Sequence, residues 1–418
     1  MRAEILATGD EIRTGALVDS NSSYISEKLG EIGVEVHRHH CVGDHPATIE
    51  RVLLEISERS ELAVVTGGLG PTTDDITAEA AARAARVGLV LDEGALSDIR
   101  ALFDKIGRTM GESNNKQAYL PAGAQCFRNP VGTAPGFSMM INKCRFYFVP
   151  GVPYEMKRML SDQVLPDISE RMGDGRKHFR VKTISTFGLP ESTVGEEMAG
   201  VSELFPGIEL GLRAKFPEIQ VKLYAQGADP QELETLLESA AGWVSETFGK
   251  HVFSTTGDAM QKVVGDLLLK ENATIALAES CTGGLIANWL TNVAGSSDYF
   301  LFSGVTYSNA AKCNIFGVTP ETITQYGAVH ENTVREMAEG ARRVVGAKYG
   351  LATSGIAGPG GGTDEKPVGT LCVGLAAPAF TRGKRFTFQY GQRLMNKQRF
   401  AMTALEMLRR ELLGIGGA

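Results

Sequence analysis

Residues 3–7 read AEILA and residues 62–66 read LAVVT, and a glycine turn follows each of these apolar runs, GDE at 9–11 and GGLG at 67–70. Helical spacing of apolar side chains recurs at 22–31 and 47–59, and a further short apolar run lies at 34–37. Strands that alternate with helices predict repeated β-α-β units and therefore a largely parallel sheet. Because parallel strands end at one edge of their sheet, we expect both glycine turns to border a ligand site there.

The same alternation continues along the chain and divides it into three segments. A helix predicted over 153–165 ends the first segment, and the polar residues GDG at 173–175 and TGD at 256–258 mark two boundaries. A chain of 418 residues is also too long for one hydrophobic core, because single cores stop growing at roughly 250–300 residues. The predicted fold class is α/β throughout, with domains at 1–172, 176–255 and 258–414.

The last two segments carry a regular pattern of strands and helices. Strands are predicted at 179–187, 208–214, 219–226, 274–278, 304–307, 350–353, 369–375 and 385–390, and helices at 191–200, 230–248, 259–271, 284–292, 331–345 and 394–412. The second segment holds no catalytic constellation, so we interpret it as a scaffold. The third segment is predicted to have a core of its own.

Charge is distributed unevenly in a chain whose net charge is −7. Residues 1–257 hold 26 Lys and Arg against 36 Asp and Glu, whereas residues 258–418 hold 16 against 13. An acidic first part suits a divalent cation and disfavours a nucleic-acid backbone, while a basic last part suits a small anionic substrate.

Cellular location is predicted from what the sequence lacks. No apolar run approaches the ~18 residues that span a bilayer, and the first residues lack a signal-peptide core. The six cysteines form no CxxC pair and no Cys/His cluster. We therefore expect a cytoplasmic protein with reduced thiols.

The hexapeptide ESCTGG at 279–284 lies where an apolar strand turns into a helix. This position is expected to expose Ser280 beside unpaired N–H groups of the first helical turn, which can stabilise an oxyanion. Two other interpretations are open on these residues alone. Ser280 can be a helix N-cap, and Cys281 is a rival nucleophile because a helix N-terminus acidifies a thiol.

Lys312 is the candidate base, since it ends the string YSNAAK at 307–312 after a second strand. A lysine is usually a solvated surface charge. Burial against a serine, however, would lower its pKa and let the neutral amine take the hydroxyl proton. The third segment contains one histidine, His330, so no histidine competes for this role.

A glycine-rich segment, TSGIAGPGGG at 353–362, offers backbone that can approach a phosphate or a ribose closely. Such segments are also ordinary turns. It leads into EKPVGT at 365–370, and Arg393 then opens the last helix. A guanidinium at that place can pair with a phosphate or lie in solvent.

The string TGGLGPTTDD at 66–75 follows a strand and leads into a helix. Its glycines let the backbone approach a phosphate, and Asp74 and Asp75 can hold a cation, although Asp74 can instead be a helix N-cap. Other polar residues are expected at the same sheet edge: Asp10, Glu11, Asp19, Asn21 and Asp44. Carboxylates beside phosphate-binding glycines indicate metal-assisted phosphoryl chemistry.

The strings ESCTGG, VTYSNAAK, SGIAGPGGG, EKPVGT and GQR occur in this order, and with them the chain resembles the CinA (competence/damage-inducible protein A) family over essentially its full length. The resemblance implies that the last domain is a nicotinamide mononucleotide amidohydrolase, with Ser280 as nucleophile, Lys312 as base and Cys281 as a neighbour. Further implied site residues are Tyr307, as a catalytic residue, and Thr282, Gly283, Asn309, Thr353, Ser354, Gly355, Gly358, Arg393 and Lys397, as substrate-binding residues. Lys397 departs from the family, in which arginine is common at this place, so a bidentate grip is lost there.

The first domain resembles the molybdopterin-binding fold, through GDEIRTGALVDSN, TGGLGPTTDD, NNKQAYLPAGA, NPVGTAPGF and PGVPYEM. In its CinA version the resemblance implies an ADP-ribose pyrophosphatase that needs a divalent metal such as Mg, Mn or Co. Asp75 is then the first metal ligand and a catalytic residue. The further implied metal ligands are Asp74, Asp10 and Asp44, and the implied substrate contacts are Thr66, Gly67, Gly68, Gly70, Lys116 and Asn129.

The middle segment resembles a KH-type fold but lacks a GxxG loop with basic flanks, so we do not expect it to bind RNA. Two other functions are open: the first domain can bind a nucleotide or a pterin without hydrolysis, or the protein can be a scaffold in competence or the DNA-damage response. The acidic net charge speaks against direct DNA contact. We expect nucleotides as partners, a homodimer, and neither nucleic acid nor membrane.

Overall fold

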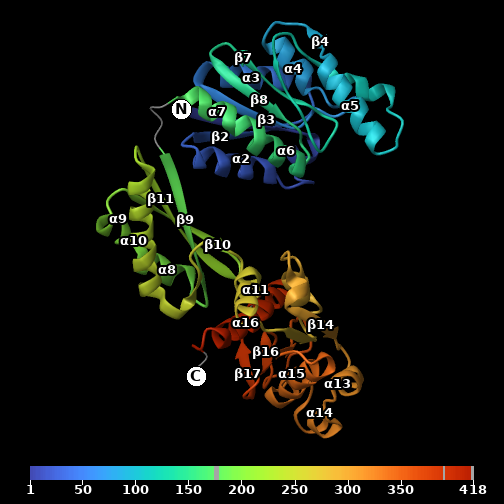
Figure 1. Ribbon diagram of the computed structural model, residues 1–418, viewed down its shortest axis with the longest axis vertical. Helices are drawn as coiled ribbons and strands as arrows, with labels where there is room; N and C mark the ends of the chain where they lie inside the picture. Colours follow the sequence, from blue (N-terminus) through green and yellow to red (C-terminus); the bar gives the residue numbers. More distant parts are fainter. Residues whose placement is uncertain (174–177, 389–390, 416–418) are drawn as a thin grey trace. The chain divides into compact units, whose positions relative to one another are not determined.

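The computed structural model describes residues 1–173, 178–388 and 391–415. The chain forms two compact units, Met1–Arg180 with Gln226–Glu234, and Val181–Ala225 with Thr235–Ala418 (Figure 1). Within the described residues, no helix is long and apolar enough to cross a membrane.

A six-stranded sheet forms the centre of the first unit, in the order β2-β1-β3-β8-β7-β6. Its strands are β1 (Arg2–Thr8), β2 (Glu35–Val42), β3 (Leu62–Thr66), β6 (Gln125–Phe127), β7 (Gly136–Ile141) and β8 (Cys144–Val149). β1 pairs in parallel with β2 and β3, and β3 pairs in parallel with β8, whereas β7 and β6 are antiparallel additions. The predicted largely parallel sheet is confirmed, and the antiparallel side was not predicted.

Helices cover both faces of this sheet, because successive side chains of a buried strand point to opposite sides. Ile5 and Val64 pack with α2 (Ser20–Glu31), α6 (Pro153–Met159) and α7 (Leu165–Met172), which Figure 1 shows together on one side. Leu6 packs with α3 (Pro46–Arg59) and α4 (Thr77–Ala84) on the other side. Each fully buried aliphatic side chain contributes roughly 1.5–3 kcal/mol, so this core fixes the strand ends and their loops.

Short elements complete the first unit. A π-helical segment, Leu160–Val164, joins α6 to α7, so the helix predicted over 153–165 continues to Met172. The other elements are α1 (Asp10–Arg13), β4 (Leu89–Leu91), α5 (Glu93–Lys105), the 3-10 helix Glu112–Ala118 and β5 (Tyr119–Pro121).

Glu4 is a buried carboxylate in the middle of β1, with 2 % of its surface exposed. Arg59 donates to both of its oxygens at 2.8 Å, Ser60 Oγ donates to Oε1 at 2.7 Å, and His40 Nε2 lies 2.5 Å from Oε2. Burial alone would raise the pKa of Glu4, but these hydrogen bonds outweigh it and lower the pKa to about 2. The charge thus ties β1 to β2 and to the end of α3.

The middle part of the chain, in the second unit, has a four-stranded sheet in the order β10-β11-β9-β12. Its strands are β9 (His178–Phe187), β10 (Ile208–Lys215), β11 (Glu218–Gly227) and β12 (Val252–Ser254), and its helices are α8 (Glu191–Met198), α9 (Val201–Leu204), α10 (Pro230–Phe248) and the 3-10 helix Gly249–His251. Phe187 and Phe253 belong to the same hydrophobic cluster as α11 and α16 of the last part. The two parts of the second unit therefore share a core.

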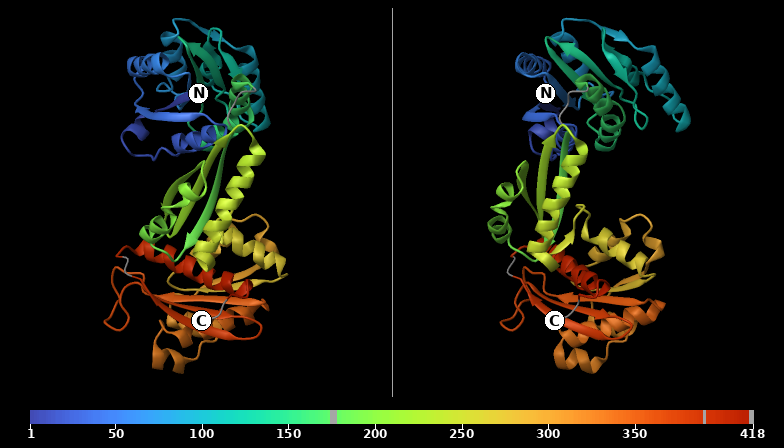
Figure 2. Two further views of the ribbon diagram at one scale, coloured as in Figure 1. Left: turned by 90° about the vertical axis from the view of Figure 1, so that its left-hand side faces the viewer. Right: turned by 60° about the vertical axis from the view of Figure 1, so that its left-hand side comes forward.

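The last part is a second helix-sheet-helix sandwich, with strand order β14-β13-β15-β16-β17. The strands are β13 (Ile275–Glu279), β14 (Phe300–Val305), β15 (Tyr349–Gly355), β16 (Thr370–Ala376) and β17 (Thr381–Thr387). The helices are α11 (Met260–Lys270), α12 (Leu285–Thr291), the 3-10 helix Ser296–Asp298, α13 (Asn309–Phe316), α14 (Pro320–Tyr326), α15 (Glu331–Val345) and α16 (Arg393–Leu412). In Figure 2, α16 (red) lies on one face of the orange sheet, and residues 309–345 lie on the other.

Most predicted elements of the second unit lie within two residues of their observed bounds. The strand predicted at 304–307 instead begins at Phe300, and the strand predicted at 385–390 begins at Thr381 and ends at Thr387. β12, α13 and α14 were not predicted. Residues 389–390 of the strand predicted at 385–390, and residues 174–175 of the predicted first boundary, lie outside the described residues. All six cysteines are free thiols, as predicted, whereas the exact domain bounds stay a prediction.

Replacing Glu4 with Gln is expected to lower the free energy of unfolding by about 2–3 kcal/mol at neutral pH, because the substitution removes a charge that Arg59 and His40 stabilise. Since the folded pKa is depressed, this contribution is complete above the ordinary value of 4.5 and is lost as the pH falls to about 2. Urea denaturation followed by circular dichroism at several pH values measures both effects.

Glu27→Gln is the matched control, because Glu27 is an exposed carboxylate on α2. Equal unfolding midpoints for Glu4→Gln and Glu27→Gln at neutral pH would show that the buried charge contributes nothing.

Candidate active site

Ser280 and Lys312 lie side by side in the last part of the chain. Ser280 directly follows β13, and Lys312 lies on the first turn of α13, which Ser308 caps through its side chain. Lys312 Nζ is 3.1 Å from Ser280 Oγ, and only 1 % of Lys312 and 8 % of Ser280 are exposed. A buried lysine in contact with a serine hydroxyl is the arrangement that a Ser/Lys dyad requires.

The amine of Lys312 has two further partners, both of them backbone carbonyls. Its Nζ donates to Thr306 O at 2.8 Å and to Tyr307 O at 3.3 Å. A neutral amine has two hydrogens and one lone pair, so in that form the two carbonyls can take its hydrogens and its lone pair can accept the proton of the Ser280 hydroxyl. Burial lowers the pKa of Lys312, which favours this neutral form.

Glu279 caps the helix that follows Ser280. Its buried carboxylate accepts from the N–H groups of Gly284 (2.9 Å) and Ala287 (2.9 Å), and more weakly from that of Ile286 (3.3 Å). The prediction that these N–H groups are unpaired beside an exposed Ser280 is therefore wrong. The N–H groups of Cys281 and Thr282, the two residues that directly follow Ser280, are the candidate donors for an oxyanion.

Cys281 does not have the properties of a nucleophile. It is 4 % exposed and belongs to the hydrophobic cluster of the last part. Burial raises its pKa to about 12, whereas the sequence alone left open an acidified thiol at a helix terminus. Because the thiolate is the reactive form of cysteine, Ser280 is the better placed nucleophile of the two.

Three of the side chains predicted to bind substrate make hydrogen bonds within the protein. The buried hydroxyls of Thr282 and Thr353 lie 2.8 Å apart and join the loop after β13 to β15. Ser354 Oγ donates to Ala328 O at 2.7 Å. Gly355 ends β15, Gly358 lies in the loop that follows it, and the exposed Asn309 opens α13.

Arg393 connects two of the predicted segments at the start of α16. Its Nη1 donates to Gly358 O at 2.7 Å, and its Nη2 donates to the hydroxyl of Tyr307 at 2.9 Å. A Cβ placed on Gly283 would lie 3.3 Å from Lys397 Nζ. The structure thus places Arg393 in contact with Tyr307 and Lys397 beside Gly283, while substrate binding by these residues stays a prediction.

Sequence reasoning missed two residues of this region. Glu279 is the first residue of the ESCTGG string, and its apolar neighbours make it look like the last residue of the strand. Its capping role depends on three N–H groups that only the fold brings close to its carboxylate. Asn396 is completely buried and donates to Ala357 O at 3.0 Å, which holds the glycine-rich segment against α16. A polar residue inside an apolar helix face was the available signal for Asn396.

A cleft of about 520 Å³ lies at the carboxyl edge of the first sheet, where both glycine turns were predicted to meet. Thr8, Gly9, Thr66, Gly67, Gly68 and Gly70 line it. Thr66 is buried, and its hydroxyl accepts a hydrogen bond from Asn21 and donates one to Pro150 O. Gly67 has a φ of 108°, and a Cβ there would meet Thr8 O at 2.4 Å, so glycine is required for this close approach.

Asp44, Asp74 and Asp75 line the same cleft, and Asp10 lies on the adjacent loop. Asp44 Oδ2 accepts from the N–H of Asp10, Asp10 pairs with Arg13 at 2.9 Å, and Asp75 accepts from Thr72. Burial and the neighbouring carboxylates raise the pKa of Asp44. Among the described residues, no three such side chains converge to hold a metal ion, so a cation here would need substrate oxygens as further ligands, as Mg²⁺ commonly does.

The two remaining predicted contacts of the first domain differ in their positions. Lys116 lines a second cleft of about 390 Å³, on the other side of the GGLG turn, and its Nζ donates to Thr72 O at 2.8 Å. Asn129 is engaged in its own loop, donating to Ala134 O and Glu155 and accepting from Val131 N–H. Its hydrogen bonds favour a structural role over the ribose contact predicted for it.

The fold and these two regions define a mixed α/β protein with polar side chains gathered at the carboxyl ends of parallel strands. Three family models match it: the probable molybdopterin binding domain at 4–170, the damage-inducible protein CinA KH domain at 181–254, and the CinA C-terminal domain at 257–412. The chain belongs to the CinA family.

Two relatives of this chain match it over nearly its whole length and over the whole of their own. The chain is 51% identical over 413 residues to a CinA-like protein of Desulfosudis oleivorans, with 99% of this chain and 100% of the relative covered. It is 47% identical over 422 residues to a CinA-like protein of Desulforapulum autotrophicum, with both chains covered completely. A solved CinA structure from Thermoplasma acidophilum, described as being of unknown function, is 33% identical and covers 40% of this chain and 97% of its own, with a TM-score of 0.37.

Proposed function

We propose that the last domain is an amidohydrolase that converts nicotinamide mononucleotide and water to nicotinate mononucleotide and ammonia. One observation supports this function above all: the buried amine of Lys312 uses its hydrogens on two carbonyls and faces Ser280 Oγ at 3.1 Å. The substrate itself comes from the family resemblance. The mildly basic charge of residues 258–418 suits its phosphate.

In the proposed reaction Ser280 Oγ attacks the carboxamide carbon while Lys312 Nζ takes the hydroxyl proton. The N–H groups of Cys281 and Thr282 are the candidates to stabilise the oxyanion that forms on the carboxamide oxygen. Lys312 then gives the proton to the leaving nitrogen, ammonia departs, and an ester remains on Ser280. A water activated by the same amine hydrolyses this ester, which releases nicotinate mononucleotide and the free serine.

Arg393 and Tyr307 are proposed to hold the phosphate end of the substrate. Their side chains are hydrogen-bonded to each other and lie on the exposed rim of the region. A guanidinium offers several donors in a fixed plane and can serve a carbonyl and a phosphate together. Lys397 supplies a second, more flexible charge beside Gly283.

Ser280→Ala and Lys312→Ala are each expected to lower ammonia release from nicotinamide mononucleotide at least ~10³-fold, and the double variant should lose little more, because the two residues act as one unit. Lys312→Arg should not restore activity, since a guanidinium stays protonated. An assay of ammonia release at saturating substrate measures these rates.

Cys281→Ser is the matched control for the nucleophile and should keep substantial activity. A Ser280→Ala variant that works at the parental rate beside an inactive Cys281→Ser variant would assign the nucleophile to the thiol.

The turnover number is expected to rise with pH and then level off below the ordinary lysine pKa of 10.5, because burial lowers the pKa of Lys312 and the neutral amine is the active form. A pH series of turnover numbers at saturating substrate measures this profile. A rate that is constant between pH ~6 and ~9, or that falls as the pH rises, would contradict a lysine base.

A second candidate activity belongs to the first domain, which we propose to be an ADP-ribose pyrophosphatase that uses a divalent cation. The specific observation in its favour is the cleft of about 520 Å³, in which carboxylates and close-approach glycines line one wall. Asp75 and Asp44 are the proposed protein ligands, and the cation would neutralise charge on the phosphates. Binding without hydrolysis is the alternative for this cleft, and the cytosolic location and the homodimer also stay predictions.

A chelator is expected to abolish ADP-ribose cleavage and to leave ammonia release from nicotinamide mononucleotide intact, because a Ser/Lys dyad needs no metal. Asp75→Ala should reproduce the effect of the chelator, whereas Ser280→Ala should cleave ADP-ribose at the parental rate. ADP-ribose cleavage that persists in Asp75→Ala would remove Asp75 from the metal site.

A further inference from the structure

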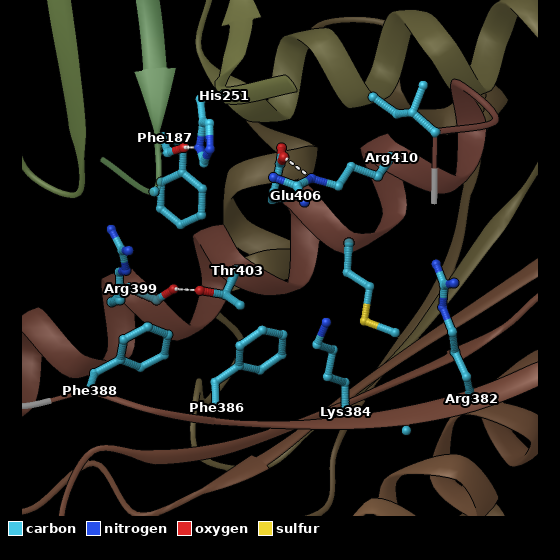
Figure 3. Close-up of a pocket in the computed structure, with 14 residues that line it drawn as sticks. Phe187, His251, Arg382, Lys384, Phe386, Phe388, Arg399, Thr403, Glu406 and Arg410 are labelled. Carbon is cyan, nitrogen blue, oxygen red and sulfur yellow. Dashed lines mark hydrogen bonds and ion pairs between the residues drawn. The ribbon is translucent and has the colours of Figure 1, made fainter. Parts of the chain in front are cut away.

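A third cleft, of about 510 Å³, lies in the second unit, where the middle part of the chain meets α16 and β17. Figure 3 shows its walls: Phe187 and His251 come from the middle part, while Lys384 and Phe386 stand on β17 and point toward α16. Its volume is in the range typical of sites for small molecules. We call it the interdomain cleft, and none of the residues discussed around Ser280 lines it.

Basic side chains dominate the interdomain cleft. Arg382, Lys384, Arg399 and Arg410 line it, and Glu406 is the one carboxylate among the lining residues. Glu406 is already neutralised, because Arg409 donates to both of its oxygens and Arg410 Nε donates to Oε1 at 2.6 Å. Glu411 pairs with Arg382 at 3.3 Å. Among the described residues that line the cleft, basic side chains outnumber acidic ones four to one, in a chain whose net charge is −7.

Aromatic rings form the second feature of the interdomain cleft. Phe386 and Phe388 lie two residues apart, so they face the same side of their extended segment. Their ring centroids are 6.3 Å apart, and their planes differ by only 6°. Both rings are partly buried, so each has one side packed against protein and an edge or face turned toward the cleft.

Several cations of the interdomain cleft lie over rings. The Arg399 guanidinium is 4.3 Å from the centroid of Phe187 and 5.2 Å from that of Phe388, and Lys384 Nζ is 5.8 Å from the centroid of Phe386. Arg399 also donates to Pro217 O at 3.3 Å, in the turn between β10 and β11. Cation-π contact holds these charges near the rings, on α16 for Arg399 and on β17 for Lys384 (Figure 3).

We propose that the interdomain cleft binds a nucleotide, with its base against Phe386 and Phe388 and its phosphate among Arg382, Lys384 and Arg410. A planar base stacks on aromatic and guanidinium faces, and an anionic phosphate matches the predominantly basic lining of the cleft. An apolar ligand would bury the basic side chains of the cleft without a partner for their charges. Inorganic phosphate would make no contact with Phe386 and Phe388, so a nucleotide matches the cleft better than either. The volume accommodates one nucleotide and not a folded nucleic acid.

This site is distinct from the two catalytic regions proposed above. Helix α16 contributes Arg393 and Lys397 to the region of Ser280, and Arg399, Thr403 and Arg410 to the interdomain cleft. AMP is a suitable probe because it has neither a pyrophosphate bond nor a carboxamide. Its binding can therefore be measured whether or not the proposed reactions occur.

The test is isothermal titration calorimetry of the full-length protein with AMP in the presence of a chelator. AMP is expected to saturate a site whose affinity falls as salt is added. Lys384→Glu should raise the Kd at this site about tenfold or more, because a repulsive charge replaces a phosphate contact. Phe386→Leu, which keeps apolar bulk in the core, should weaken AMP severalfold but leave inorganic phosphate unaffected, because only the base uses the ring.

Lys270→Glu is the matched control, since it reverses the charge of another exposed lysine at the end of α11. It should bind AMP like the parent, and thermal unfolding should confirm that all three variants are folded. Adenosine and inorganic phosphate should each bind more weakly than AMP. The proposal is overturned if AMP does not saturate, if Lys384→Glu and Phe386→Leu bind it like the parent, if phosphate alone binds as tightly, or if a single-stranded oligonucleotide competes at lower concentration.

Discussion

The burial of one amine among backbone carbonyls is the constraint on which the proposed chemistry depends. Lys312 makes no ion pair among the described residues, and Thr306 O, Tyr307 O and Ser280 Oγ surround its Nζ. A charged ammonium would be costly in such a place, because burial penalises charge and no carboxylate compensates for it. Burial thus lowers the pKa of Lys312 and favours the neutral amine that a general base requires, without a histidine.

That arrangement needs two strand ends to be held in register. β13 and β14 run in parallel, with Glu279 opposite Val305, so Ser280 and Thr306 leave the sheet side by side. Thr306 N–H donates to Glu279 O at 2.9 Å, and the Glu279 side chain holds the start of α12. One residue therefore joins the neighbouring strand through its backbone and the following helix through its carboxylate, which leaves little freedom for the loop that carries Ser280.

The sequence predicted the architecture well because its signals were local. Short apolar runs ending on glycine turns identified β1 and β3, and unbroken helical spacing identified α15 over exactly the residues observed. The pairing of Ser280 with Lys312 came from recognising the motifs, since 32 residues separate them and no local pattern joins them. The expectation of an exposed Ser280 beside unpaired N–H groups was wrong, because whether a helix terminus has unpaired N–H groups depends on a side chain folding back onto them. Asn129 was assigned to a ligand although its own loop uses its amide fully.

Helix α16 has 20 residues, and its first turn contacts a different part of the protein from the turns that follow. Its first turns contact the glycine-rich segment through Arg393 and Asn396, while Arg399 and Thr403 face the interdomain cleft. A shift of this helix that favoured a ligand at one of these places would change the affinity at the other. Thermodynamic linkage makes such an influence reciprocal: whatever factor an occupant of the cleft imposes on substrate affinity, the substrate must impose on the occupant.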